Sequence, residues 1–437
     1  MKTLKEIKNG NLYYNGYDLE KLAKEYGTPL KVTFLDVISE HITSLKNSFN
    51  AAIKETGYKG NFIYLNANKA NYGKEEIETS FIAGDGLETS SYYDLLLTLK
   101  MFKNHPEFKN KLIVSNGLKL NDYLDEIINA NNNGYNIIDI IDDIREYEYL
   151  KSKNVSLKVG FRCHLSSQYE PEVKDDRFGL LDDEIKYILD DVKNTKLSLT
   201  TIHYHQRGFD YEEDKFDANL LKAFNNYLNA KKQYNTLVNF DIGGGMPLPI
   251  EENFNYDAFI KRMLNKLKDL CLKNNIDMPN IIGENGKFSQ KDSTVNIYKV
   301  VGVKNTGEYP WHIVNGSLLI ALPEMFALGE PIEVRPINNL TSPMQKVRLA
   351  GITCDCDDVL FDREKGYFLL PNEKDNYIGL IGTGSYQNSM NGKGGVHHCL
   401  LPEEKDVIIY TKDGKEVREI RHDLQSIDDI YRIINFN

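Results

Sequence analysis

Between about residues 61 and 284, short apolar runs alternate with longer amphipathic stretches. Eight of the runs have the length of β-strands, and several of the stretches between them have helical periodicity, as in YDLLLTLKMF and YDAFIKRMLNKLKDL. The strand candidates are FIYLNAN (62–68), GLETS (86–90), KLIVSN (111–116), NIIDII (136–141), LKVGFRC (157–163), LSLTTIHY (197–204), LVNFDI (237–242) and NIIGE (280–284). Eight β/α alternations predict an α/β fold, a closed (β/α)8 barrel, with a doubly wound sheet as the alternative.

Beyond about Phe288 the pattern changes to short β-like segments separated by Gly, Pro and Asn turns, which predicts a mostly β domain. The early segment TPLKVTFL (28–35) is expected to pair with this domain. We therefore expect an N-terminal segment at residues 1–40 that pairs in part with the β domain, the barrel at 41–287, and the β domain at 288–437.

Composition and charge narrow the function classes. A chain of 437 residues suits a barrel of roughly 250 residues plus a second domain. The net charge of −11 argues against nucleic acid or an anionic membrane as partner. The first residues form no apolar signal core, and five scattered cysteines suit a reducing compartment better than a disulfide framework. We expect a soluble, cytoplasmic protein.

Several conspicuous residues directly follow or end the predicted barrel strands, where catalytic groups of barrels gather. Lys69 follows the first strand, and a desolvated lysine there forms a Schiff base more readily than a solvated one. His203 and His205 belong on one face, but no third metal ligand has convincing spacing, so no metal site is predicted. The glycines 243–245 fit either an anion site or a tight turn, and Glu284 either a pyridine-nitrogen partner or an ion pair.

The predicted β domain has two further groups of candidate residues. Cys354 and Asp355 stand in GITCDCDDVL, where a thiol for proton transfer adjoins carboxylates for a cationic substrate. Tyr386 lies in the glycine-rich loop GTGSYQNSMNG, within which it and the backbone are candidates to bind a phosphate. The run 397–399, His-His-Cys, is interpreted as structural.

The order of these motifs is more specific than any one of them. Lys in a K-A-N setting, then H-x-H, G-G-G, Glu-x-Gly, a Cys-Asp pair and a Gly-x-Tyr loop resembles the pyridoxal-phosphate-dependent ornithine, diaminopimelate and arginine decarboxylases. GLETSS, LIVSNGLKLNDYL and ITCDCDD look most similar to bacterial biosynthetic arginine decarboxylases. The resemblance covers nearly the whole chain. It implies a homodimer, a barrel like that of alanine racemase, and pyridoxal 5′-phosphate as cofactor.

The resemblance also implies roles for individual residues. Lys69 would hold the cofactor covalently, His205 would stack on its ring, and Glu284 would pair with the pyridine nitrogen. Cys354 would return a proton to the substrate carbon, and Asp355 would meet the distal cation of the substrate across the dimer interface. The remaining cofactor-binding residues implied by the resemblance are Glu88, Arg162, Gly243, Gly244, Gly245, Gly286 and Tyr386.

Two motifs depart from the family pattern. The usual H-x-G-S is His-Gln-Arg-Gly at 205–208, which leaves Arg207 as a substitute phosphate ligand, and the usual E-P-G-R ends in Lys287. The resemblance implies decarboxylation of a basic amino acid, with arginine converted to agmatine as the first expectation. Diaminopimelate, ornithine and lysine are the alternative substrates, and a non-catalytic cofactor-binding regulator is the alternative of another class.

Overall fold

The computed structural model describes residues 4–165, 177–206, 213–248 and 254–436, apart from the side chains of 213–215 and 388. The described chain divides into two compact units. The barrel unit comprises residues 41–69 and 77–288, and the β unit comprises residues 4–40, 70–76 and 289–436. The short segment 70–76 belongs to the β unit, where Glu76 forms an ion pair with Arg421.

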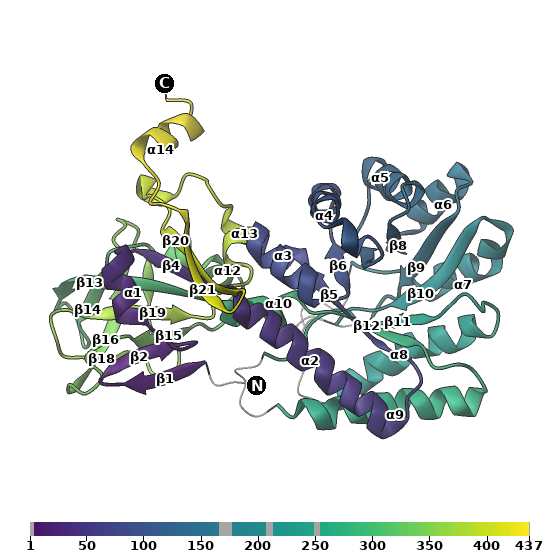
Figure 1. Cartoon of the computed structure of the whole chain (residues 1–437), viewed down its shortest axis with the longest axis horizontal. Helices are drawn as coiled ribbons and strands as arrows, with labels where there is room; N and C mark the ends of the chain where they lie inside the picture. Colours follow the sequence, from purple (N-terminus) through teal and green to yellow (C-terminus); the bar gives the residue numbers. More distant parts are fainter. Residues whose placement is uncertain (1–3, 166–176, 207–212, 249–253, 437) are drawn as a thin grey trace. The chain divides into compact units, whose positions relative to one another are not determined.

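Eight parallel strands close the barrel (Figure 1). Each strand lies within one of the eight apolar runs, so the prediction that these runs are barrel strands is confirmed. The order around the barrel is β10-β11-β12-β5-β6-β7-β8-β9. The strands are β5 (Phe62–Ala67), β6 (Gly86–Thr89), β7 (Leu112–Ser115), β8 (Asn136–Ile141), β9 (Leu157–Arg162), β10 (Leu197–His203), β11 (Asn239–Asp241) and β12 (Asn280–Glu284). Leu65, Val114, Ile138 and Ile282 from different strands pack together in the barrel core. The doubly wound alternative is therefore wrong.

Helices between the strands cover the outside of the barrel (Figure 1). α9 shows why these segments are helical: Phe259, Ile260, Met263 and Leu267 recur at helical spacing and are all buried. The helices between barrel strands are α3 (Lys74–Ala83), α4 (Tyr92–Asn104), α5 (Asn121–Asn132), α6 (Ile144–Lys153), α7 (Asp182–Asp191), α8 (Glu213–Lys231) and α9 (Tyr256–Asn274). α2 (Leu35–Thr56) precedes the first barrel strand, and the short α10 (Gly286–Gln290) follows the last. Among the described residues, none of the helices combines the length and apolar character that crossing a bilayer requires.

A ten-stranded sheet forms the centre of the β unit, and the early strand β4 (Leu30–Phe34) lies inside it. β4 pairs antiparallel with β13 and parallel with β20. The other strands of this sheet are β13 (Thr294–Lys304), β14 (Trp311–Val314), β15 (Glu333–Pro336), β16 (Met344–Ala350), β17 (Val359–Leu360), β18 (Phe368–Pro371), β19 (Tyr377–Ile381), β20 (Lys405–Lys412) and β21 (Lys415–His422).

Smaller elements complete the β unit. A three-stranded sheet is formed by β1 (Lys5–Lys8), β2 (Asn11–Tyr14) and β3 (Tyr17–Asp18). The short helices are α1 (Leu19–Tyr26), α11 (Leu318–Ala321), α12 (Pro323–Leu328), α13 (Gln387–Asn391) and α14 (Ile427–Ile433).

Candidate active site

Lys69 lies at the C-terminal end of β5, in the 3-10 turn Asn68–Ala70. Its ammonium Nζ is 2.9 and 3.0 Å from the two carboxylate oxygens of Glu88, which is fully buried on β6. The neighbouring Asn68 is buried and donates hydrogen bonds to Asp94 and Thr98, which fixes the turn. The lysine is therefore held at the mouth of the barrel with a buried carboxylate at hand to accept its protons.

A buried amide joins two carboxylates at the same end of the barrel. Nδ2 of Asn116, one residue beyond β7, donates to Glu88 Oε1 at 2.9 Å and to Glu284 Oε1 at 2.7 Å. Glu284 ends β12, so the amide connects strands on two sides of the barrel mouth. The acid beside Lys69 and the acid at position 284 thus belong to one hydrogen-bonded network.

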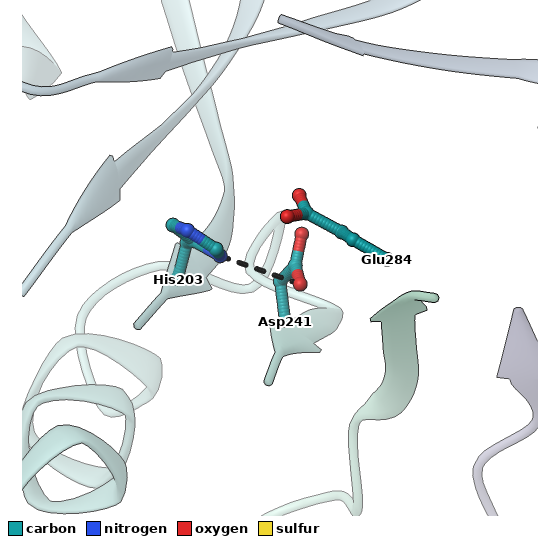
Figure 2. A group of neighbouring side chains, drawn as sticks. All are labelled: His203, Asp241 and Glu284. Carbon is teal, nitrogen blue, oxygen red and sulfur yellow. Dashed lines mark ion pairs between the residues drawn. The ribbon is translucent and has the colours of Figure 1, made fainter. Parts of the chain in front are cut away.

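Glu284 also lies in a buried group with His203 and Asp241, which end the adjacent strands β10 and β11 (Figure 2). His203 Nδ1 is 3.3 Å from Asp241 Oδ1. Each of the three residues offers one ligand atom within 4.8 Å of the others, so the group has donor chemistry suited to a cation. The sequence interpretation saw no third residue beside the histidines, because Asp241 and Glu284 approach only through strand pairing.

Burial changes the protonation of this group. It raises the pKa of the Glu284 carboxyl to about 8, and the nearby Asp241 adds to the rise. It raises the pKa of Asp241 to about 7 and lowers that of His203 to about 4. At neutral pH the histidine is therefore uncharged, and the two carboxyl groups share a proton because neither can ionise without cost beside the other.

The glycine triplet packs against His205. Gly243 has a φ of 66°, and a Cβ atom on it would come within 2.6 Å of the His205 ring nitrogen Nδ1. A Cβ on Gly244 would lie 2.4 Å from the carbonyl oxygen of Glu284. The N–H of Gly244 donates to His205 Nδ1 at 3.3 Å, whereas Gly245 is exposed. Larger residues at 243 and 244 would push the histidine and β12 apart.

Arg162 and His205 lie in the same electrostatic environment as Lys69. Burial first, and then the charges of Arg162 and Lys69, lower the pKa of His205 well below its ordinary value. Arg162 ends β9, with its guanidinium 3.9 Å from Asp142 and stacked over the Phe178 ring. The His205 imidazole is therefore uncharged at neutral pH, and the face of an uncharged imidazole suits contact with a flat ring.

The remaining residues singled out from the sequence fall in several places. Gly286 begins α10, two residues after Glu284 in the barrel unit. In the β unit, Tyr386 has a φ of 60° and its N–H donates to the carbonyl of Ala70 at 2.7 Å, next to Lys69 in sequence. Cys354 is exposed there, and Asp355 is paired with His398. Arg207 and Gly208 lie outside the described residues.

Residues 39–290 match the family model described as "Pyridoxal-dependent decarboxylase, pyridoxal binding domain". A biosynthetic arginine decarboxylase from Prochlorococcus marinus (strain MIT 9515) is 27% identical over 307 residues, 65% of this chain and 47% of that protein. Another, from Proteus mirabilis (strain HI4320), is 23% identical over 360 residues, 77% of this chain and 53% of its own length. The chain spans about half the length of these curated relatives.

Solved structures have the same fold. The crystal structure of the biosynthetic arginine decarboxylase from Campylobacter jejuni is similar with a TM-score of 0.86 and 20% identity, covering 99% of this chain and 91% of that one. The crystal structure of the diaminopimelate decarboxylase from M. jannaschii in complex with L-lysine is similar with a TM-score of 0.79 and 20% identity. The match covers 98% of this chain and 96% of that one. At this identity the likeness shows a barrel joined to a mostly β domain.

Proposed function

The chain belongs to the family of pyridoxal-dependent decarboxylases, and we propose that it removes the α-carboxylate of a basic amino acid. The substrate we propose is arginine and the product agmatine, so that the reaction belongs to polyamine biosynthesis. One observation carries this proposal: a lysine held 2.9–3.0 Å from a buried carboxylate shares a hydrogen-bonded network with a second buried acid of raised pKa. The similarity to biosynthetic arginine decarboxylases supports arginine.

The cofactor of this family is pyridoxal phosphate, and three features of the barrel unit suit its chemistry. Lys69 supplies an amine for the aldehyde. Oδ2 of Asp241 is buried, and among the described residues it has no hydrogen-bond donor beside it while both Asp241 and Glu284 are ionised. Protonation of either carboxyl group would let the two form a hydrogen bond. A protonated ring nitrogen facing Glu284 would supply the missing positive charge. Gly243 and Gly244 let the backbone approach His205 and Glu284 more closely than any Cβ atom would allow, which brings backbone N–H groups to this end of the barrel.

The residues of this chain would divide the work as follows. Lys69 would hold the cofactor, Glu284 would face its ring nitrogen, and His205 would cover the ring. When bound, pyridoxal phosphate supplies the electron sink for the carbanion left by carbon dioxide. Glu88 accepts the proton that Lys69 must lose before its nitrogen can act as a nucleophile. Burial keeps the His205 imidazole neutral by lowering its pKa, and the charge of Arg162 adds to this effect.

Further residues complete the proposed site. The glycine triplet, Gly286 and Tyr386 are proposed to hold the phosphate. Cys354 is proposed to give a proton to the α-carbon after carbon dioxide leaves, and Asp355 to bind the distal cation of the substrate. We propose that these two residues act in the site of a second copy of the chain, in a cytoplasmic homodimer.

A substrate panel tests the proposed reaction. The protein loaded with pyridoxal phosphate is incubated separately with arginine, ornithine, lysine and diaminopimelate, and the amine and carbon dioxide formed are measured. Agmatine from arginine is the expected product. Lysine formed from diaminopimelate would move the assignment to the alternative substrate, and no carbon dioxide from any of the four would contradict the decarboxylase itself.

Complementation tests the shared site. Lys69→Ala and Cys354→Ala are each expected to be inactive as homodimers, but a mixture refolded together should recover about a quarter of the parent activity. This fraction follows because half of the dimers are mixed, and each mixed dimer has one site with neither substitution. Mass measurement of the intact dimers checks that mixed dimers have formed. If they have formed and no activity is recovered, the two copies do not share their active sites.

A further inference from the structure

Two exposed thiols in the β unit lie in direct non-bonded contact. Cys354 belongs to the loop after β16, and Cys399 lies in the 3-10 turn His398–Leu400, 45 residues further along the chain. Their sulfur atoms are 3.4 Å apart. Since a disulfide bond measures about 2.0 Å, the two sulfurs need approach by only about 1.4 Å to form one. Both side chains are exposed in a single copy of the chain.

The backbone at Cys399 turns sharply toward Cys354. Cys399 has a φ of 57° and Leu400 a φ of 53°, so two consecutive non-glycine residues are in the left-handed region. Residues other than glycine seldom adopt this conformation, and it persists only where surrounding structure enforces it. This unusual turn includes the residue whose thiol approaches Cys354.

An imidazole and a carboxylate adjoin the pair. Nδ1 of His398 is 2.9 Å from the Cys399 sulfur, and Nε2 of the same ring is 3.2 Å from Asp355 Oδ2. The carboxylate orients the ring, so that its Nδ1 faces the thiol and can take the thiol proton. The Cys354 backbone N–H and then its thiol, followed by His398, lower the pKa of Cys399, whereas the hydrogen bond with Cys399 raises that of Cys354.

We propose that Cys399 and Cys354 form a reversible disulfide bond when the protein meets an oxidised low-molecular-weight thiol such as glutathione disulfide. The Cys399 thiolate attacks one sulfur of the reagent, its proton passing to His398, and one glutathione leaves. The Cys354 thiol then loses its proton and its sulfur attacks the Cys399 sulfur, so that the second glutathione leaves. The two departing glutathione thiolates take up the protons from His398 and from Cys354. Two protein thiols are oxidised and one disulfide is reduced to two glutathiones, which balances atoms and electrons.

The consequence for activity rests on the proposed function. If Cys354 gives the proton to the α-carbon, the oxidised protein has no thiol proton to give, and decarboxylation stops until a reductant opens the bond. Position 399 would then be a modification site that senses the thiol–disulfide state of the surroundings, and His398 its positioning residue.

Mass spectrometry of the loaded enzyme tests the bond itself. The reduced protein is treated with glutathione disulfide, quenched and digested under acid. The parent protein is expected to yield the Cys354 and Cys399 peptides joined and lighter by two hydrogens. Cys356→Ser is the matched control, since Cys356 is exposed but no second sulfur of the described residues is hydrogen-bonded to it; it should behave as the parent. Cys399→Ser should give no joined peptide. Joined peptides absent from parent and control would overturn the proposal.

Two further readouts separate the parts of the inference. His398→Gln should slow alkylation of Cys399 by iodoacetamide on the order of 10-fold, and an equal rate would remove the role of His398. Oxidation should abolish carbon dioxide release in the parent and Cys356→Ser, with recovery by dithiothreitol, and spare Cys399→Ser. If the peptides join while carbon dioxide release is unchanged, the disulfide stands and the proton-donor role of Cys354 fails.

Discussion

Replacement of Lys69 by alanine is expected to abolish both carbon dioxide release and the visible absorbance band of the bound cofactor. The side chain is proposed to hold the cofactor covalently and to transfer protons to and from Glu88, 2.9–3.0 Å away. Loss of general acid–base catalysis alone costs about 10²- to 10⁴-fold in rate. The measurements are turnover with arginine and the absorbance spectrum of the purified variant.

Two further variants make the Lys69 result specific. Lys69→Arg keeps a cation beside Glu88 but has no amine for the aldehyde, so it should also lack the band and the activity. Lys74→Ala removes an exposed lysine at the start of α3 and should behave as the parent. An unchanged absorbance band in Lys69→Ala would show that another residue binds the cofactor.

Replacement of Glu284 by glutamine is the second large effect, with an expected fall in kcat on the order of 10²-fold. A neutral amide cannot stabilise a cationic ring nitrogen opposite it, so the electron sink is weakened. The exposed Glu107→Gln variant is the control and should keep the parent kcat. A kcat for Glu284→Gln equal to that of the parent would contradict the proposed pairing.

The same substitution should change how stability depends on pH in the cofactor-free protein. Burial raises the pKa of Glu284 from 4.5 to about 8, so between these values the folded state keeps a proton that the unfolded chain has lost. Stability from this group is therefore complete below pH 4.5 and is lost as the pH rises through 8. Asp241 changes the stability in the same direction, because burial raises its pKa from 3.8 to about 7.

His203 acts in the opposite direction between pH 4 and 6.5, because burial lowers its pKa. The window above pH 6.5 therefore isolates the carboxyl groups. From pH 6.5 to 8 the free energy of unfolding of the parent should fall by on the order of 1–2 kcal/mol, which corresponds to about one proton. Urea titrations across this window should show a flatter curve for Glu284→Gln than for the parent and Glu107→Gln. Equal slopes in all three would contradict the shared proton.

The barrel is largely readable from the sequence because a parallel strand covered on both faces is a continuous apolar run. All eight runs are barrel strands, from β5 to β12. In the β unit the sequence pattern was weaker. β21, KEVREIRH, is mostly exposed and has no apolar alternation, so it was not predicted; its position follows from pairing with β20.

The candidate site was readable only in part. Lys69 and Glu284 could be picked out because each adjoins the end of an apolar run. Asp241 was overlooked inside LVNFDI, although only Ile242 separates it from the glycine segment, and Asn116 ended a predicted strand without a role. Their importance comes from neighbouring strands in the closed barrel, which single-strand patterns do not encode.

From the sequence alone, His398 and Cys399 had no role beyond a structural one. Forty-five residues separate Cys399 from Cys354, and no motif links them. Their approach depends on the loop after β16 and on two left-handed residues, neither of which has a sequence signature.

The central claim is a covalent bond between the cofactor and the ε-nitrogen of Lys69. The direct measurement is borohydride reduction of the loaded protein, followed by digestion and peptide mass spectrometry. The claim predicts a single pyridoxyl-phosphate adduct on the peptide containing FIYLNANK, at Lys69. An adduct on a different lysine, or full cofactor loading with no adduct on any peptide, would contradict it.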